Sequence, residues 1–89
     1  MTSSIDIFRR HVTALGGIYY RIDSGYMNGR NSNATDDAMA YHFRKARETL
    51  SAACKDDSDP LPEYLDTPRG ARLAAKWAAL EYRYLGVRA

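Results

Sequence analysis

The side chains of this 89-residue chain that could ligate a metal ion are too scattered to predict a metal site. The soft or borderline ligands are His11, His42 and Cys54, and none of them has a paired spacing such as Cys-x-x-Cys or His-x-x-x-His. The acidic run at 56–59 resembles a calcium loop but lacks the glycine at its sixth position and the glutamate at its twelfth. We therefore expect no bound metal, histidines that are exposed or half-buried, and an acidic run that only ends a helix.

Catalytic groups are equally sparse. Cys54 lies near the end of a predicted helix, where the helix dipole does not favour a reactive thiolate, so we expect an inert side chain at the edge of the core. The acids gather in one connector and at helix starts, which is typical of capping and solubility rather than of paired catalytic carboxylates. No glycine-rich segment carries the residues of a phosphate-binding loop. The sequence predicts a protein that is not an enzyme and uses no cofactor.

Arginine and tyrosine are the residues that favour binding. The chain has ten arginines against three lysines, and tyrosine lies near arginine on every predicted helix. These two residue types dominate protein interfaces, and they also stack on bases and hold phosphates. The candidate binding residues are Arg69, Arg72, Lys76, Arg83, Tyr82, Tyr20, Tyr41 and Arg44. For the four basic residues from 69 to 83, two alternatives to binding a partner remain. They form either a solvated helix face or ion pairs with the acidic connector of the same chain.

Helices must position these residues, and the first two follow from apolar spacing. Apolar residues from Ile5 to Ile22 recur every three or four positions, which predicts a helix over 4–23 capped by Ser3. The same spacing predicts a second helix over 34–54, capped by Asn33 or Thr35. The segment 24–33 between them is predicted as a loop, in which Tyr26, Met27 and Arg30 either pin the loop to the bundle or face a partner.

A pair of glycines interrupts the first helix. Gly16 and Gly17 lie inside its apolar pattern, and the pattern continues across them. We expect the helix to continue, with either a bend or a close approach by a neighbouring backbone at this point.

The third helix follows a proline-containing connector. The apolar residues of the connector fit a short helical turn near 61–65. Asp66 or Thr67 then caps a helix over 68–85, with Pro68 at its first position and Gly86 just past its end.

This third helix has two apolar faces where a surface helix of a small domain usually needs one. One narrow arc carries Leu73, Trp77, Leu80 and Tyr84. A broader arc, which we call the alanine face, also includes Tyr82 and Leu85, and its alanines are the candidate interface residues Ala71, Ala74, Ala75, Ala78 and Ala79. The sequence leaves open whether the alanine face is core or interface.

The whole chain is predicted to be one helical domain over residues 1–89, an all-α bundle of three main helices. Its net charge of only +2 does not indicate a broad nucleic-acid footprint. A single cysteine excludes an intramolecular disulfide, and no run reaches the length of a membrane span or resembles a secretory signal. We expect no contact with a membrane and a cytoplasmic location.

Taken together, these features predict a binding protein that acts by protein–protein contact as an inhibitor, regulator or adaptor. The alanine face would also allow self-association into a homo-oligomer. Small size with many arginines and tyrosines is also the general type of accessory protein that phages and mobile elements use against host machinery. The alternative is a nucleic-acid- or nucleotide-binding module that uses the arginines and tyrosines of the third helix.

Overall fold

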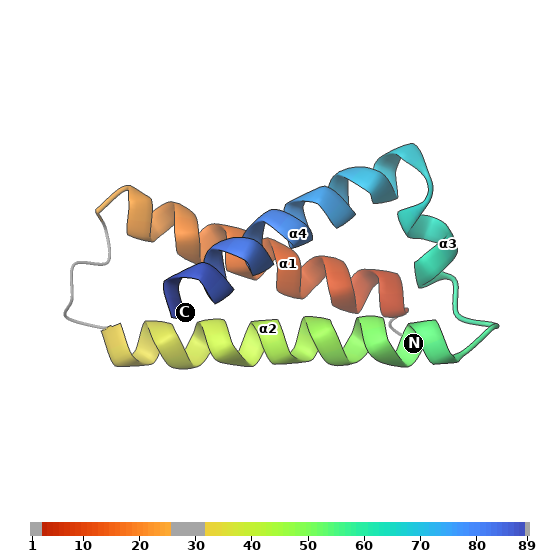
Figure 1. The fold of residues 1–89 in the computed structure, drawn as a ribbon, viewed down its shortest axis with the longest axis horizontal. Helices are drawn as coiled ribbons and strands as arrows, with labels where there is room; N and C mark the ends of the chain where they lie inside the picture. Colours follow the sequence, from red (N-terminus) through yellow and green to blue (C-terminus); the bar gives the residue numbers. More distant parts are fainter. Residues whose placement is uncertain (1–2, 26–31, 89) are drawn as a thin grey trace.

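The computed structural model describes residues 3–25 and 32–88, and these ranges are helical except for caps and connectors. Four helices follow one another in them: α1 (Ser4–Asp23), α2 (Ser32–Lys55), α3 (Leu61–Leu65) and α4 (Pro68–Arg88) (Figure 1). The predicted all-α bundle of three main helices with a short turn at 61–65 is therefore confirmed. The loop residues Tyr26, Met27 and Arg30 lie outside the described ranges.

α1 forms as its sequence predicts. The side chain of Ser3 caps it by accepting a hydrogen bond from the backbone N–H of Asp6 at 3.2 Å. The helix continues through both glycines, and what approaches Gly16 is a side chain rather than a backbone. A Cβ atom added at Gly16 would lie 3.0 Å from Cε of Lys76 in α4. Gly16 thus leaves room for α4 where it crosses α1.

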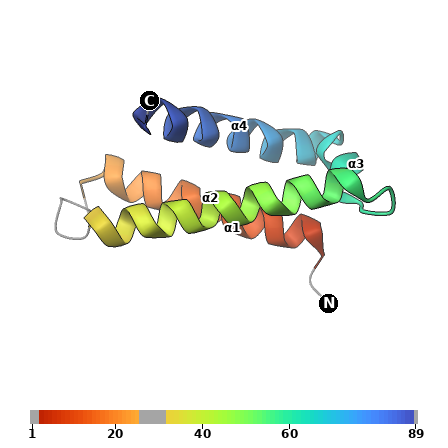
Figure 2. The same cartoon turned by 60° about the horizontal axis from the view of Figure 1, so that its bottom comes forward.

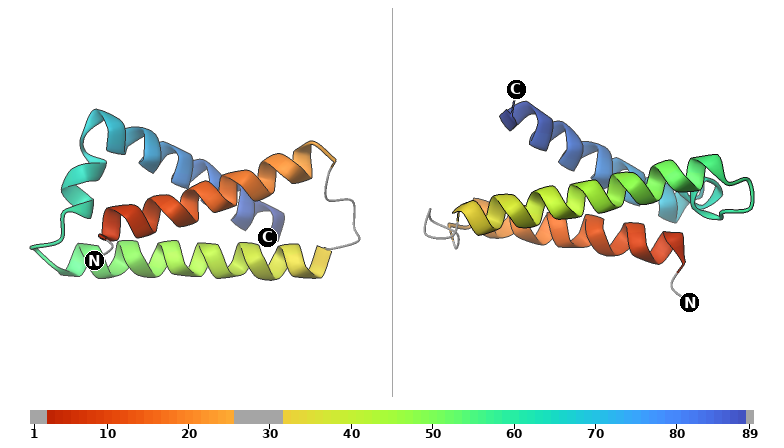
Figure 3. Two further views of the ribbon diagram at one scale, coloured as in Figure 1. Left: turned by 180° about the vertical axis from the view of Figure 1, so that it is seen from behind. Right: turned by 90° about the horizontal axis from the view of Figure 1, so that it is seen from below.

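The three long helices form two layers. α1 and α2 lie side by side as an antiparallel pair, and α4 lies across them (Figure 2). Seen from behind, α4 crosses α1 obliquely, while α3 joins the end of α2 to the start of α4 (Figure 3). The backbones of α1 and α2 pack along their length, whereas those of α2 and α4 come close only locally.

The core lies where the three long helices meet. The ring of Trp77 in α4 contacts Phe8 of α1 edge-on at 5.6 Å between ring centroids and Phe43 of α2 at 5.5 Å. Leu80 is buried beside Trp77, and Leu73 and Tyr84 pack against the same cluster. The narrow apolar arc predicted on the third helix is therefore a core face. The other fully buried side chains include Val12, Leu15, Ala46 and Leu61.

A tight corner connects α3 to α4. Thr67, rather than Asp66, caps α4, because its Oγ1 accepts a hydrogen bond from the backbone N–H of Gly70 at 3.1 Å. Pro68 takes the first helical position as predicted. Gly70 is buried, and a Cβ atom there would lie only 1.8 Å from the carbonyl oxygen of Tyr64. The corner can close only because residue 70 has no side chain.

Two predicted helix boundaries are wrong. α2 begins at Ser32, so Asn33 and Thr35 lie inside the helix and neither is its cap. α4 continues to Arg88, so Gly86 lies within the helix instead of just past its end. Glycine lowers helix stability by about 1 kcal/mol relative to alanine, and that cost is too small to stop a helix by itself.

Candidate functional site

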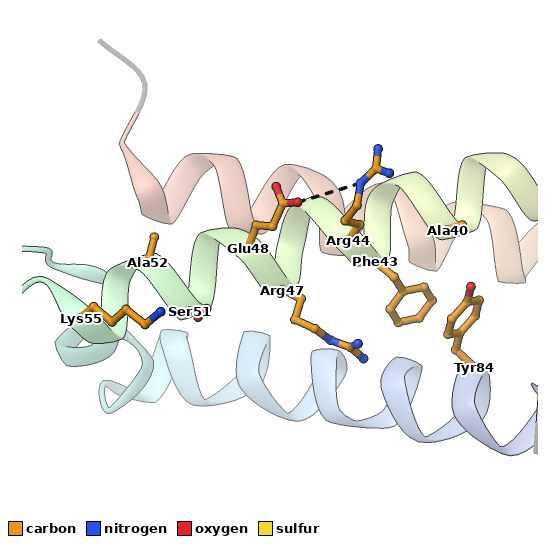
Figure 4. Close-up of a pocket in the computed structure, with 9 residues that line it drawn as sticks. All are labelled: Ala40, Phe43, Arg44, Arg47, Glu48, Ser51, Ala52, Lys55 and Tyr84. Carbon is orange, nitrogen blue, oxygen red and sulfur yellow. Dashed lines mark ion pairs between the residues drawn. The ribbon is translucent and has the colours of Figure 1, made fainter.

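A groove of about 600 Å³ runs between α2 and α4. All but one of its lining residues come from α2, and Figure 4 shows them as Ala40, Phe43, Arg44, Arg47, Glu48, Ser51, Ala52 and Lys55, with Tyr84 from α4. These positions recur every three or four residues, so the groove follows the α2 axis for about 22 Å. Its volume falls in the range of ligand pockets, which is about 300–1,000 Å³.

The groove has an apolar end and a polar middle. At the apolar end, the rings of Phe43 and Tyr84 stack with their centroids 4.1 Å apart. In the middle, Nη2 of Arg47 donates to Oε2 of Glu81 in α4 at 3.2 Å. These two contacts join α2 to α4 through side chains and hold the walls of the groove in place.

Cations outnumber acids along the groove. Arg44, Arg47 and Lys55 line it, and Glu48 is the one acidic lining residue. The carboxylate of Glu48 lies 4.0 Å from Nε of Arg44 and 3.8 Å from Nζ of Lys45, and both pairs are exposed. Exposed pairs of this kind contribute little to stability. Arg44 and Arg47 are thus already paired within the chain, and Lys55 is the lining cation that forms no ion pair among the described residues.

The alanine face is exposed rather than core. Ala71, Ala75, Ala78 and Ala79 are exposed, and Ala74 is half-buried. Tyr82 is 84% exposed and Leu85 is 49% exposed. The helix therefore buries only its narrow apolar arc within this chain.

One edge of the alanine face lies on the side of α4 that is turned toward α2. Glu81 marks this side, because it pairs with Arg47 of α2. The same side of the helix carries Ala74 and Ala78, seven and three residues before Glu81, and Leu85, four residues after it. None of these three residues lines the groove, so the alanine face is a separate surface.

The fold divides the four basic candidate residues of α4, which we call the basic stripe: Arg69, Arg72, Lys76 and Arg83. Arg83 makes two hydrogen bonds to Asp23 of α1, at 2.9 and 2.6 Å, and lies over the ring of Tyr19 at 4.3 Å. The hydrogen bonds from Arg83 lower the pKa of the Asp23 carboxyl. Lys76 lies against Gly16, and the exposed Arg69 and Arg72 make no ion pair among the described residues. Of these four residues, Arg83 is thus the one that fastens α4 to α1 by hydrogen bonds.

The acidic connector does not cover the basic stripe. Asp59 instead accepts hydrogen bonds from the hydroxyl of Ser4 and from the backbone N–H of Leu61. Asp56 accepts two hydrogen bonds from Ser58, and these bonds lower the pKa of its carboxyl. The run at 56–59 shapes the end of α2, as predicted.

The three candidate tyrosines are all exposed but do not share one surface. Tyr20 is 71% exposed on α1 and Tyr82 is 84% exposed on the alanine face. Tyr41 is 45% exposed on α2, with Arg44 5.9 Å from the centre of its ring. Of these three tyrosines, only Tyr82 belongs to the alanine face.

A histidine pair joins α1 to α2, and the spacing of the sequence did not predict it. Nδ1 of His11 lies 2.9 Å from Nδ1 of His42, so one ring donates a proton to the other. Burial lowers the pKa of His11, and His42, Arg10 and Lys45 lower it further by charge repulsion. His11 and His42 lie at the same height along the two antiparallel helices. The sequence could indicate this contact only if the alignment of the two helices were already known.

The described residues hold no cluster of three or more His, Cys, Asp and Glu side chains that could bind a metal. Cys54 is exposed, so its predicted place at the edge of the core is wrong. It falls on the solvent side of the last turn of α2, next to the buried Ala53. None of the described helices is long and apolar enough to cross a membrane.

Comparison of the chain with protein-family models, curated proteins and solved structures found no match.

Proposed function

We propose that this chain is a non-enzymatic protein that acts by protein–protein contact, as an inhibitor, regulator or adaptor in the cytoplasm. One observation carries the proposal: α4 presents a second apolar face to solvent, in which four of the five alanines, Tyr82 and Leu85 are exposed. Contiguous exposed apolar surface on a small protein typically marks an interaction site. Tyrosine and arginine at its borders are the residue types most enriched in binding hot spots. An accessory protein of a phage or mobile element is one setting that suits a small protein of this kind.

The proposal is tested by the double variant Ala75→Glu/Ala78→Glu. Both side chains are exposed, so we expect the variant to stay folded, with a free energy of unfolding within about 1 kcal/mol of the wild type. Ala46→Glu is the matched control for core burial, because Ala46 is fully buried on α2, and we expect that variant to unfold. Thermal unfolding followed by circular dichroism distinguishes the two.

Binding is then measured with a partner from the source organism. Wild-type protein is used to capture it, and the purified partner is titrated against each variant by calorimetry. We expect Ala75→Glu/Ala78→Glu to abolish binding and Thr13→Glu, on the exposed side of α1, to preserve it. Equal affinity for all folded variants would overturn the proposal. Light scattering on the free protein shows whether a second copy is itself the partner.

A second candidate is binding of a nucleic acid or nucleotide through α4. The observation in its favour is that Arg69 and Arg72 are exposed and form no ion pair among the described residues. Phosphate contacts make affinity fall steeply with salt, whereas an apolar protein interface is nearly indifferent to it. Titrating a labelled oligonucleotide at two salt concentrations, with wild type and with Arg69→Ala/Arg72→Ala, tests this candidate.

A further inference from the structure

Three cations lie on consecutive turns of α4, and none of them forms an ion pair among the described residues. Arg69, Arg72 and Lys76 are three and four residues apart and all exposed, so they share one side of the helix over about 10 Å. Like charges at this spacing repel each other, so an anion placed between them would stabilise this side of α4. Asp66 comes three residues before Arg69, and the uncompensated charge is therefore greatest at Arg72 and Lys76.

The two acids of the neighbouring helix α1 are already paired. The carboxylate of Asp6 lies 3.7 Å from Nη1 of Arg9. Asp23 accepts two hydrogen bonds from Arg83, the last residue of the basic stripe. Neither acid is left to balance the remaining charge of α4.

The side of α1 next to the basic stripe combines a bare backbone with an exposed ring. A Cβ atom added at Gly16 would lie 3.1 Å from Nζ of Lys76, so the ammonium group lies close to the backbone of α1. Tyr20 is 71% exposed and comes four residues after Gly16, on the same side of the helix. α4 contacts α1 on either side of this tyrosine, at Gly16 and at Asp23. An exposed ring thus lies along the border between α1 and the basic stripe.

Unpaired cations beside an exposed ring suit a single-stranded nucleic acid. Phosphate oxygens accept hydrogen bonds from arginine and lysine, and any base stacks on an aromatic ring. An acidic peptide would pair with the cations but has no base to stack on the ring. Three cations over about 10 Å, in a chain of net charge +2, fit a few phosphates of one strand and not the broad footprint of a duplex.

We infer that the basic stripe binds a short stretch of single-stranded nucleic acid, with phosphates on Arg72 and Lys76 and a base on the ring of Tyr20. This inference rests on the second candidate function and specifies its ligand and its site. The alanine face, which carries the proposed protein contact, takes no part in it.

The test is fluorescence anisotropy with a labelled single strand of about 12 thymidines, a length typical of single-strand sites. We expect Arg72→Ala/Lys76→Ala to weaken binding at least about tenfold, because two phosphate contacts are lost. The slope of log affinity against log salt should become shallower by about 1.4, since each phosphate contact to a single strand contributes about 0.7. The matched control Arg44→Ala/Lys55→Ala removes the same charge from α2 and should keep the affinity within about twofold.

Two pairs of variants test the uncharged parts of the site. Tyr20→Leu should weaken binding at least about fivefold, whereas Tyr20→Phe should preserve it because phenylalanine still stacks on a base. Gly16→Ala should displace the side chain of Lys76 and weaken binding, whereas Gly17→Ala, with no atom nearer than 3.8 Å to its Cβ, should preserve it. Both alanines favour the helix, so lost binding in Gly16→Ala would not reflect unfolding.

No binding of the strand would overturn the inference together with the second candidate function. Equal loss in the two charge variants, or a polyglutamate peptide that binds the stripe as tightly as the strand, would overturn the inference as well. Binding that depends on Arg72 and Lys76 but is unchanged in Tyr20→Leu would overturn the inference and leave the second candidate function standing. The proposed protein contact is tested separately by Ala75→Glu/Ala78→Glu.

Discussion

At the scale of single residues, the contact between His11 and His42 is the most informative. Their Nδ1 atoms lie 2.9 Å apart, so one ring donates a hydrogen bond to the other and links α1 to α2. Burial and the neighbouring charges of Arg10 and Lys45 lower the pKa of His11. A positive charge on His11 is therefore disfavoured in the folded protein.

The pair predicts a pH dependence of stability. Because the pKa of His11 in the folded protein is below its unfolded value of about 6.5, the unfolded state binds more protons as the pH falls. The contribution of His11 is fully present above pH 6.5 and is lost as the pH falls toward its folded pKa. We expect the free energy of unfolding in urea to decrease from pH 7.5 to 5.5. His11→Gln should flatten this decrease, and an unchanged slope in that variant would contradict the assignment.

At the scale of elements, the corner between α3 and α4 fixes the direction of the third long helix. Arg9 of α1 donates a hydrogen bond to the hydroxyl of Tyr64 at 2.7 Å, which holds α3 against the start of the bundle. Thr67 caps α4, and Gly70 lets the first turn of α4 pack on the backbone at Tyr64. At the far end, the bond from Arg83 to Asp23 fastens α4 to α1. These contacts fix the orientation of α4 and therefore which way its exposed alanine face points.

A pair of glycine substitutions tests the corner. Gly70→Ala should lower the free energy of unfolding by about 1–3 kcal/mol or more, because its Cβ would overlap the carbonyl oxygen of Tyr64 and backbone must move. Gly17→Ala is the matched control: the nearest atom to its Cβ is 3.8 Å away, and alanine favours the helix by about 1 kcal/mol. The midpoints of urea denaturation of the two variants should therefore shift in opposite directions from that of the wild type. A neutral Gly70→Ala would show that the corner is not tightly packed.

At the scale of the whole molecule, one residue joins all three long helices. Trp77 contacts Phe8 on α1 and Phe43 on α2, and it is the one tryptophan of the chain. The molecule measures 44 × 28 × 22 Å, so its core is thin and depends on this cluster. Its fluorescence therefore reports on the packing of the complete bundle.

We expect Trp77→Ala to lower the free energy of unfolding by about 3–5 kcal/mol, enough to unfold a marginally stable small domain. Tyr82→Ala, which removes an aromatic ring that is 84% exposed, should change it by less than about 0.5 kcal/mol. In the wild type, unfolding followed by tryptophan fluorescence and by circular dichroism should coincide. Two separate transitions would show that α4 unfolds independently of the α1–α2 pair.

The helices themselves could be predicted because their signals are local. Ser3, Thr67 and Pro68 act within one turn of the chain, and the apolar spacing of α1 and α2 reports which side of each helix is buried. The end of α4 was predicted wrongly because Gly86 is only a weak signal for the end of a helix. The start of α2 was predicted wrongly because capping residues also occur inside helices. Cys54 was misplaced because a small apolar residue at a helix end carries no strong burial signal.

The sequence by itself thus determined that this protein is an all-α bundle and that its third helix has more apolar surface than one seam can bury. Only the tertiary structure decided that the alanine face is exposed, that Arg83 is bound to Asp23, and that a groove opens beside α2. The physical reason is that helix formation depends on neighbours three and four residues apart, whereas exposure depends on where the other helices lie. The groove opens where α4 crosses α1 and comes close to α2 only locally.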